Sequence, residues 1–483
     1  MLASLPFVII SCLLAVGALL ALPQMIRKPG KALRSTGLVL LVAIVQVIAI
    51  ALVINRPMQY FSSPVELWEM LTNQQTTKVT ITDTLRGEEL KKTASASSQS
   101  QKMNPQTASA LPGQEQWFPS FKPSAKGGEV TVFSGPKSGV KEQVIVWTPE
   151  GYDPQDRSKT YNVLEFIHGY PGSPVSVARA LDFSGTLQKA IDQGEIAPTI
   201  VVIPEGNVNL KAPTCANVQR GAQTATWLSF DIPKMIRSVF PNVSDNRQDW
   251  MIAGNSSGAY CAARLGVLYG DIFGASGVLS GYDQPIVGNW GVRSGKTFQD
   301  NTLSSLISRP RPWTLDMYVF GAQLDRESIH IAKAFSAAQL APGDRLQLNV
   351  KAEGGHNWAT WRDQMPELYR WWQQIRTTKA PKVSQILGAD SALIPQKNPG
   401  VFSLMGLGTI TAVAAIAILA LALVVRFVPK IMEKAARASY LRALLGCVAA
   451  MMLVILAVLL PINRAGEFYT SIAEIIRTIN GAV

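Results

Sequence analysis

The sequence has few of the residues that usually bind metals or cofactors. Among 483 residues there are only four cysteines and three histidines, and no group of them has the spacing of a zinc site. The sequence also has no glycine-rich loop of the kind that holds phosphates. We therefore expect no cofactor and no metal.

Charged residues are absent from four long apolar runs, two near each end of the chain. The runs are 5–22, 37–54, 401–425 and 443–462. Each is long enough to cross about 30 Å of hydrocarbon as a helix. The first run is not interpreted as a cleaved signal peptide, because it lacks a basic start and a second apolar run follows at once. The absence of charges within the runs argues against a transport function.

Positive charge is concentrated in the two short loops that join these runs. The charged residues are Arg27, Lys28, Lys31 and Arg34 in the first loop, and Arg426, Lys430, Glu433, Lys434, Arg437 and Arg442 in the second. The two loops thus carry most of the formal net charge of +12, and no nucleic-acid partner is expected. By the positive-inside rule both loops are cytoplasmic. We expect a multi-pass plasma-membrane protein whose termini and central region lie on the extracytoplasmic side.

A near-repeat follows the second and the fourth apolar runs. The first copy is "INRPMQYFSSPVE" and the second, 408 positions later, is "INRAGEFYTSIAE". In each copy a serine precedes a glutamate by three residues, Ser63 with Glu66 and Ser471 with Glu474, which fits a capping box. We interpret the two hairpins as copies that each end in a short interfacial helix, although similar composition alone could produce the likeness.

The chain between the hairpins alternates short apolar strands with helical patterns, which predicts an α/β sheet covered on both faces. The expected strands are "EQVIVWTP", "YNVLEFIHG", "TIVVIPEG", "DWMIAGNS", "ASGVLSG", "TLDMYVFG" and "RLQLNVKAEG", and the expected helices are 227–239, 258–268, 328–338 and 358–375. Tethers rich in polar residues or proline are expected on both sides. The expected division is 1–71 hairpin and interfacial helix, 72–125 mobile tether, 126–376 catalytic domain, 377–400 return tether, and 401–483 second hairpin and interfacial helix.

"WMIAGNSSGAYCAARLGVL" has the strand, turn and helix order of a nucleophile elbow. Small residues flank Ser256, as a tight turn requires, and the following helix N-terminus favours developing negative charge. We therefore expect Ser256 to be a nucleophile.

A catalytic serine needs a histidine base, and only three are present. His356 follows a strand on a glycine-rich loop, where an imidazole can reach a neighbouring strand end. His330 lies in a helical stretch, and His168 ends a strand before a glycine-rich turn that better suits an oxyanion loop. The sequence favours His356 as the base.

The base requires an acid, which in the order serine, acid, histidine follows a strand between the other two. "MYVFGAQLDRES" offers Asp325, with Glu327 as the alternative. In the expected mechanism the serine attacks an acyl carbonyl, the histidine takes and returns its proton, and the acid stabilises the imidazolium. The backbone amides of Ser257 and Tyr170 are expected to hold the oxyanion.

"FIHGYPGS", "GNSSGAYCAA", "GAQLD" and "GGHNWATWRDQMPELYRWW", in this order and spacing, resemble the esterase D-like branch of the α/β-hydrolases. That branch includes mycolyltransferases of actinobacterial envelopes and feruloyl esterases. The resemblance covers about residues 125–376 and implies a doubly wound, mostly parallel sheet with serine-hydrolase activity. The elbow departs slightly from the pattern, with Ala259 where these esterases often have a second glycine, which puts the floor of the pocket in doubt.

The same resemblance bears on two of the cysteines. "APTCANV", followed by a cysteine just beyond the elbow, is similar to actinobacterial members of the branch. It implies a disulfide between Cys215 and Cys261, with two buried thiols as the alternative. Cys12 and Cys447 lie in apolar runs, where a small apolar role is expected.

Three functions remain open on the sequence. The first is a membrane-anchored serine esterase that acts on an ester of a membrane lipid or an envelope glycolipid, with the bilayer as its other partner. The second is an acyltransferase, similar to a mycolyltransferase, that uses the same three residues. The third is a non-catalytic binding or scaffold module. The sequence indicates neither the acyl chain nor the oligomeric state.

Overall fold

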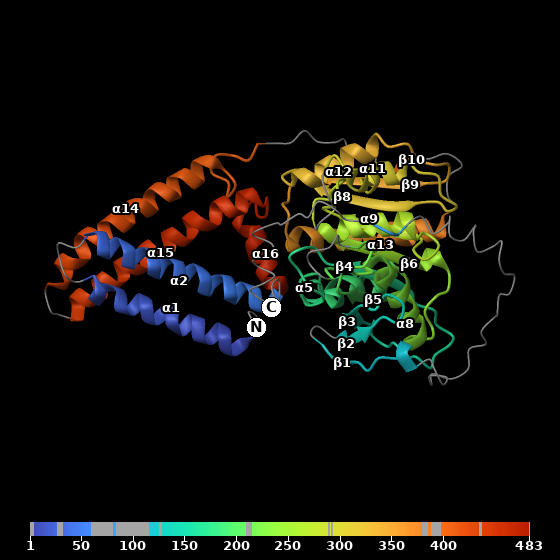
Figure 1. Cartoon of the computed structure of the whole chain (residues 1–483), viewed down its shortest axis with the longest axis horizontal. Coiled ribbons are helices and arrows are strands. Elements are labelled where there is room, and N and C mark those ends of the chain that lie inside the picture. Colours follow the sequence, from blue (N-terminus) through green and yellow to red (C-terminus); the bar gives the residue numbers. More distant parts are fainter. Residues whose placement is uncertain are drawn as a thin grey trace. The chain divides into compact units, whose positions relative to one another are not determined.

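The computed structural model divides into two compact units, Met1–Pro64 with Lys397–Arg477, and Val65–Gln396 with Thr478–Val483 (Figure 1). We describe each unit by itself. The structure describes residues 4–26, 32–58, 81–83, 115–124, 128–208, 215–287, 290, 293–378, 385–387, 398–433 and 437–482.

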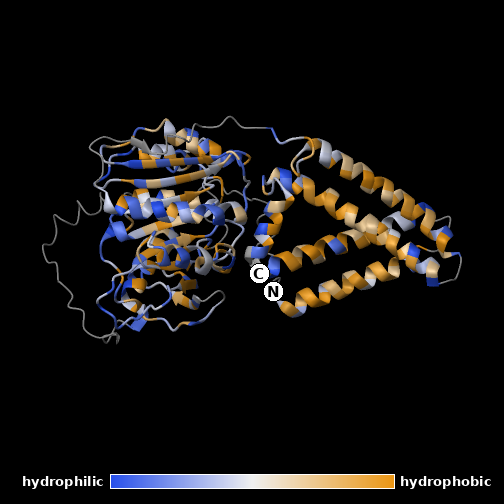
Figure 2. Ribbon diagram, turned by 180° about the vertical axis from the view of Figure 1, so that it is seen from behind, coloured by the Kyte–Doolittle hydropathy of each residue, from blue (hydrophilic) through white to orange (hydrophobic). Residues whose placement is uncertain are grey.

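The first unit contains four long apolar helices, which are α1 (Leu5–Met25), α2 (Ala32–Met58), α14 (Leu407–Met432) and α15 (Arg437–Ala465). All four are long and apolar enough to cross a membrane. Figure 2 shows hydrophobic residues along most of their length. Much of this surface is exposed, as at Leu13, Leu14 and Ile418, which suits helices that face lipid. The third expected run starts at residue 401, but its helix begins only at Leu407, because Gly406 precedes it in an extended conformation.

The two hairpins pack against each other in the first unit. A single apolar cluster takes residues from all four helices, including Leu22, Val42, Val428 and Cys447. Two hydrogen bonds join helices across it, from Tyr440 Oη to the carbonyl of Leu20 (2.7 Å) and from Gln46 Nε2 to that of Ala15 (2.7 Å). The pairs therefore form one four-helix bundle.

A short helix, α16 (Ile472–Ala482), follows the second hairpin. Ser471 caps it by accepting a hydrogen bond from the amide of Glu474 (3.4 Å), while the Glu474 carboxylate accepts one from Thr470 (2.6 Å). Half of the expected capping box is thus present, with the glutamate bonded one residue earlier than expected. The matching helix after the first hairpin, with Ser63 and Glu66, lies outside the described residues.

The second unit is built on a ten-stranded sheet in the order β1-β2-β3-β5-β4-β6-β7-β8-β9-β10. The strands are β1 (Lys122–Pro123), β2 (Gly128–Ser134), β3 (Lys141–Trp147), β4 (Asn162–Ile167), β5 (Thr199–Pro204), β6 (Trp250–Asn255), β7 (Ala275–Leu279), β8 (Asp316–Ala322), β9 (Arg345–Lys351) and β10 (Gln385–Leu387). The first three pair antiparallel, and β3 pairs antiparallel with β5. From β5 to β10 every pairing is parallel. All seven expected strands are present.

Helices cover both faces of the sheet (Figure 1). The longest are α8 (Ile232–Val239), α9 (Ser257–Leu268), α12 (Arg326–Ser336) and α13 (Trp358–Thr377). Shorter helices are α5 (Pro174–Ala180), α6 (Lys189–Asp192), α7 (Thr224–Thr226), α10 (Lys296–Asp300) and α11 (Leu303–Ile307). There are also π-helical turns at Ser184–Gln188 and Trp227–Asp231, and 3₁₀ turns at Glu115–Trp117 and Arg247–Asp249. Gly266 of α9 lies against Ser276, whereas Leu368 of α13 lies against Gly277. Neighbouring strand residues point to opposite faces, so the sheet is doubly wound, as expected.

Parts of the expected tethers belong to the second unit. Trp117 is buried in the core against Phe133, and β1 extends the sheet at one edge. Ile81 forms an antiparallel bridge to Val218, and β10 in the return segment extends the other edge of the sheet. The second unit therefore includes residues on both sides of 126–376, and the expected division stays a prediction.

Candidate active site

Ser256 lies in a sharp turn between β6 and α9. Its backbone has φ 56° and ψ −122°, a conformation that is rare for a residue with a side chain. In the stretch 250–268 every residue is buried except Ser256. The turn therefore presents one hydroxyl at the surface of an otherwise buried strand and helix, as a nucleophile elbow does.

The two glycines of the elbow allow the helix to pass close to the central strand. A Cβ atom on Gly258 would clash with the carbonyl oxygen of Ile167, and one on Gly254 would lie 2.6 Å from the same oxygen. Ile167 is the last residue of β4, the strand beside β6. Only glycine fits at either position, which explains the spacing of small residues around Ser256 in physical terms.

His356 and Asp325 form a hydrogen-bonded pair. His356 Nδ1 is 3.0 Å from Asp325 Oδ2, and the side chains are 20% and 3% exposed. Asp325 also caps α12, because its Oδ1 accepts from the amide of Ser328 at 3.5 Å. The Trp361 ring stands edge-on to the imidazole, with the ring centroids 5.0 Å apart. The carboxylate thus has a fixed position from which it can orient the imidazole.

The three side chains follow three parallel strands of one sheet. Ser256 follows β6, Asp325 follows β8 and His356 follows β9. The carboxyl ends of parallel strands lie along the same edge, which is where ligands bind in open α/β sheets. The alternative acid, Glu327, is 53% exposed and lies 3.8 Å from His330, so the structure brings Asp325 and not Glu327 to His356.

The expected oxyanion residues flank the serine. Ser257 is the first residue of α9, where backbone amides point outward without an intrahelical acceptor. Tyr170 lies in the loop after β4 and precedes a cis peptide bond to Pro171. In that loop Gly169 packs so closely on the serine that a Cβ atom would lie 2.9 Å from Ser256 Cβ. The roles of the two amides stay predictions.

A second histidine–carboxylate pair lies under this loop, and the sequence did not indicate it. The buried His168 places Nε2 2.7 Å from Glu205 Oε1 and Nδ1 2.9 Å from the carbonyl of Gly169. Asn207 Nδ2 donates to the same carbonyl at 3.3 Å. Burial lowers the pKa of His168, but the Glu205 charge and both hydrogen bonds more than offset this, so its pKa is raised. The only signal for Glu205 was a carboxylate directly after β5, the neighbour of β4.

Replacing Glu205 by glutamine is expected to destabilise the catalytic unit by about 2 kcal/mol at low pH, because a hydrogen bond to a charged group is lost. The raised pKa means that the charged His168 stabilises the folded state fully below its unfolded pKa of about 6.5, and that this contribution is lost as the pH rises through the folded pKa. The difference from wild type should therefore shrink as the pH rises. Chemical unfolding at several pH values measures it. Glu195→Gln, at an exposed pair with Arg370, is the control; equal pH profiles for both variants would refute the role of Glu205.

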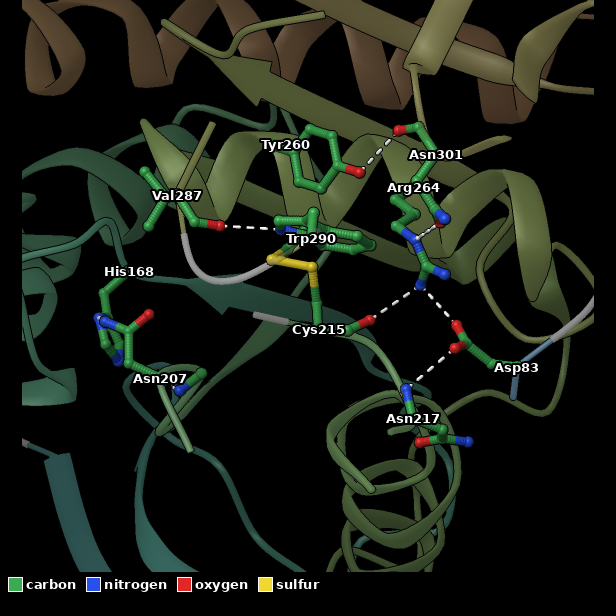
Figure 3. The surroundings of a disulfide bond; sticks show 12 residues. Asp83, His168, Asn207, Cys215, Asn217, Tyr260, Arg264, Val287, Trp290 and Asn301 are labelled. Carbon is green, nitrogen blue, oxygen red and sulfur yellow. Dashed lines mark hydrogen bonds and ion pairs between the residues drawn. A yellow bond between two sulfur atoms is a disulfide. The ribbon is translucent and has the colours of Figure 1, made fainter. Parts of the chain in front are cut away.

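Cys215 and Cys261 form a disulfide, with 5.6 Å between their Cα atoms (Figure 3). It joins the segment before α7 to the middle of α9, the helix that follows Ser256. Cys12 and Cys447 are free thiols in α1 and α15. Among the residues that the structure describes, no group of three or more His, Cys, Asp or Glu side chains could hold a metal ion.

A part of the second unit matches a known protein family. Residues 137–371 match the family model of the putative esterases. Similar solved structures include a ferulic acid esterase, with 18% sequence identity, 51% of this chain and 97% of that chain covered, and a TM-score of 0.41. An S-formylglutathione hydrolase from Staphylococcus aureus has 17% identity, with 51% of this chain and 98% of that chain covered, and a TM-score of 0.39. Another is MPT51 of Mycobacterium tuberculosis, with 15% identity, 48% of this chain and 93% of that chain covered, and a TM-score of 0.36. No curated protein matches the chain.

Proposed function

We propose that this chain, whose residues 137–371 belong to the putative esterase family of serine hydrolases, is a membrane-anchored extracytoplasmic esterase that hydrolyses an ester of a membrane lipid or envelope glycolipid. The observation that carries the proposal is the His356–Asp325 hydrogen bond at the same sheet edge as a strained, half-buried Ser256. These are the base, the acid and the nucleophile of an acyl-transfer site.

In the proposed mechanism Ser256 Oγ attacks the ester carbonyl while His356 Nε2 takes its proton. Asp325 holds Nδ1–H and stabilises the imidazolium. The C–O bond to the alcohol breaks as the histidine returns the proton to the leaving oxygen, which forms an acyl-serine. Water, deprotonated by the same imidazole, then attacks the acyl carbon; the bond to Ser256 Oγ breaks, the imidazolium returns its proton to Oγ, and the acid leaves. The amides of Ser257 and Tyr170 would stabilise the negative oxygen in both steps.

An acyltransferase uses the same residues and differs only in the second step, where a sugar hydroxyl replaces water. The two reactions share every group named above, so the site supports both. Turnover of a labelled acyl donor with and without trehalose separates them: a labelled sugar ester indicates transfer, and a labelled free acid in both reactions indicates hydrolysis.

A lipid-linked substrate is supported by the membrane unit. The four apolar helices form a bundle larger than a simple anchor requires. In α16 the apolar side chains of Ile472, Ile476 and Ile479 are exposed along one side, with the spacing of a helix that lies on a bilayer surface. The extracytoplasmic side is supported by the basic loops between the helices and by the disulfide.

A serine-directed fluorophosphonate tests the proposal on the purified full-length protein. We expect mass spectrometry to find the label on Ser256, and Ser256→Ala and His356→Ala to abolish it, because the hydroxyl is a weak nucleophile without its base. His330→Ala is the matched control, since this histidine is exposed on α12 and should leave labelling unchanged. A folded wild-type protein without label would instead favour a non-catalytic binding module.

A further inference from the structure

Arg264, in the second half of α9, is a fully buried cation. Its side chain is 1% exposed. Its Nε donates to Asn301 Oδ1 at 2.9 Å, its Nη1 donates to the carbonyl of Cys215 at 2.9 Å, and the guanidinium lies 5.4 Å from the Trp290 ring (Figure 3). A buried charge of this kind requires an opposite charge nearby, because removal from water costs several kcal/mol.

The opposite charge comes from a residue 181 positions upstream. Asp83 Oδ2 lies 2.5 Å from Arg264 Nη1, and the Asp83 side chain is 0% exposed. Its other oxygen accepts from the amide of Asn217 at 2.9 Å. Asp83 lies outside the segment that matches the esterase family, 137–371, so the family domain alone lacks a carboxylate at this position.

Backbone contacts hold the same upstream segment in place. Ile81 bridges Val218, and the amide of Thr82 donates to the carbonyl of Asn217 at 2.9 Å. The Ile81 side chain packs on the main apolar core. Residues 81–83 thus add a short extended piece beside the segment 215–218, which contains Cys215.

The Asp83–Arg264 ion pair and the disulfide both hold α9, the helix that follows Ser256. Cys261 is bonded to Cys215, and one turn later Arg264 binds the Cys215 carbonyl and Asp83 together (Figure 3). Arg264 is eight residues after Ser256 on the same rigid helix. A shift of α9 along its axis would break the ion pair and strain the disulfide, and would move the serine.

We propose that Ile81–Asp83 is a clamp of the catalytic domain and that Asp83 is a positioning residue, which acts through Arg264 to fix the helix that presents Ser256. The clamp deepens the proposed function and rests on it, because its activity readout requires Ser256 to be the nucleophile. The segment expected to be a mobile tether is, at these three residues, a part of the active-site scaffold.

The test is a cycle of three variants of the full-length protein in detergent: Asp83→Asn, Arg264→Met and the double variant. Asp83→Asn leaves the guanidinium buried without its counter-charge, so we expect Tm to fall by about 10 °C. In the double variant neither charge remains, and Tm should return to within about 3 °C of wild type. Lys296→Met, which breaks an exposed ion pair with Asp300, should leave Tm unchanged.

Activity separates positioning from stability alone. In the double variant we expect kcat for p-nitrophenyl butyrate, and the rate of fluorophosphonate labelling, to fall about tenfold with KM unchanged, because the helix has lost its clamp while the domain remains folded. Wild-type kcat in the double variant would overturn the positioning role, and wild-type Tm in Asp83→Asn would overturn the clamp itself. If the wild type neither labels nor turns over, the proposed function fails, and the Tm cycle alone decides whether the clamp exists.

Discussion

Asp325→Asn is expected to lower kcat about 10⁴-fold, the loss seen when an asparagine replaces the acid of a serine–histidine–acid triad. The amide can no longer hold the His356 tautomer in which Nε2 accepts the serine proton, nor stabilise the imidazolium. The fold should survive, because asparagine caps helices as well as aspartate does and can keep the bond to the amide of Ser328. Ester turnover and unfolding temperature, measured on the same preparation, test both statements.

Glu327→Gln is the matched control for this variant. Glu327 lies two residues later on the same helix, and its exposed carboxylate faces His330. Its removal should change neither kcat nor KM measurably. The reverse result, with Glu327→Gln inactive and Asp325→Asn active, would show that the working enzyme uses the other carboxylate.

Gly258→Ala is expected to destabilise the catalytic unit by about 3 kcal/mol or more. Its Cβ would collide with the carbonyl oxygen of Ile167, which belongs to the backbone of a central strand and cannot move away as a side chain could. The helix would have to move off the strand, and Ser256 with it. We expect poor recovery of folded protein, with the lower stability measured by chemical unfolding. We also expect loss of fluorophosphonate labelling, measured by mass spectrometry.

The neighbouring position gives the opposite substitution as a control. Ala259→Gly removes a buried methyl group and adds backbone freedom, at a cost of about 1–2 kcal/mol, without a new clash. Labelling of Ser256 should persist. If Gly258→Ala matched wild type in both stability and labelling, the close packing of α9 on β4 would not be required for the site.

The sheet was largely predictable because its central strands are short apolar runs that end in turns. The strands at the edges of the sheet, and β2 beside one of them, were not predicted. β1 and β10 are two and three residues long, too short for a pattern. In β2 burial does not follow residue polarity, because the polar Thr131 is buried whereas the apolar Val132 is 60% exposed. β2 lies next to the edge strand β1, and there local pairing outweighs the hydrophobic pattern.

The candidate catalytic residues could be named from motifs, because nucleophile, acid and base must each follow a strand in a known order. Two ion pairs elsewhere in the catalytic unit were not predictable. The pairs Glu205–His168 and Asp83–Arg264 join residues 37 and 181 positions apart, and the sequence contains no period or motif that relates them. Asp83 was further obscured because it lies within residues 72–125, a stretch whose composition is typical of a tether.

The bridge at Ile81 and the pairing of β10 also shorten the two segments that connect the catalytic unit to the apolar helices. Only residues 59–80 separate α2 from Ile81, and only residues 388–399 separate β10 from the hydrogen-bonded turn at Gly400 that precedes α14, so these connections can reach at most about 75 Å and 40 Å. If the bundle lies in a bilayer and the substrate is a lipid, as proposed, the tethered enzyme would meet its substrate in two dimensions. Its rate would then follow the mole fraction of the substrate among nearby lipids, and dilution of the whole suspension would leave that rate unchanged.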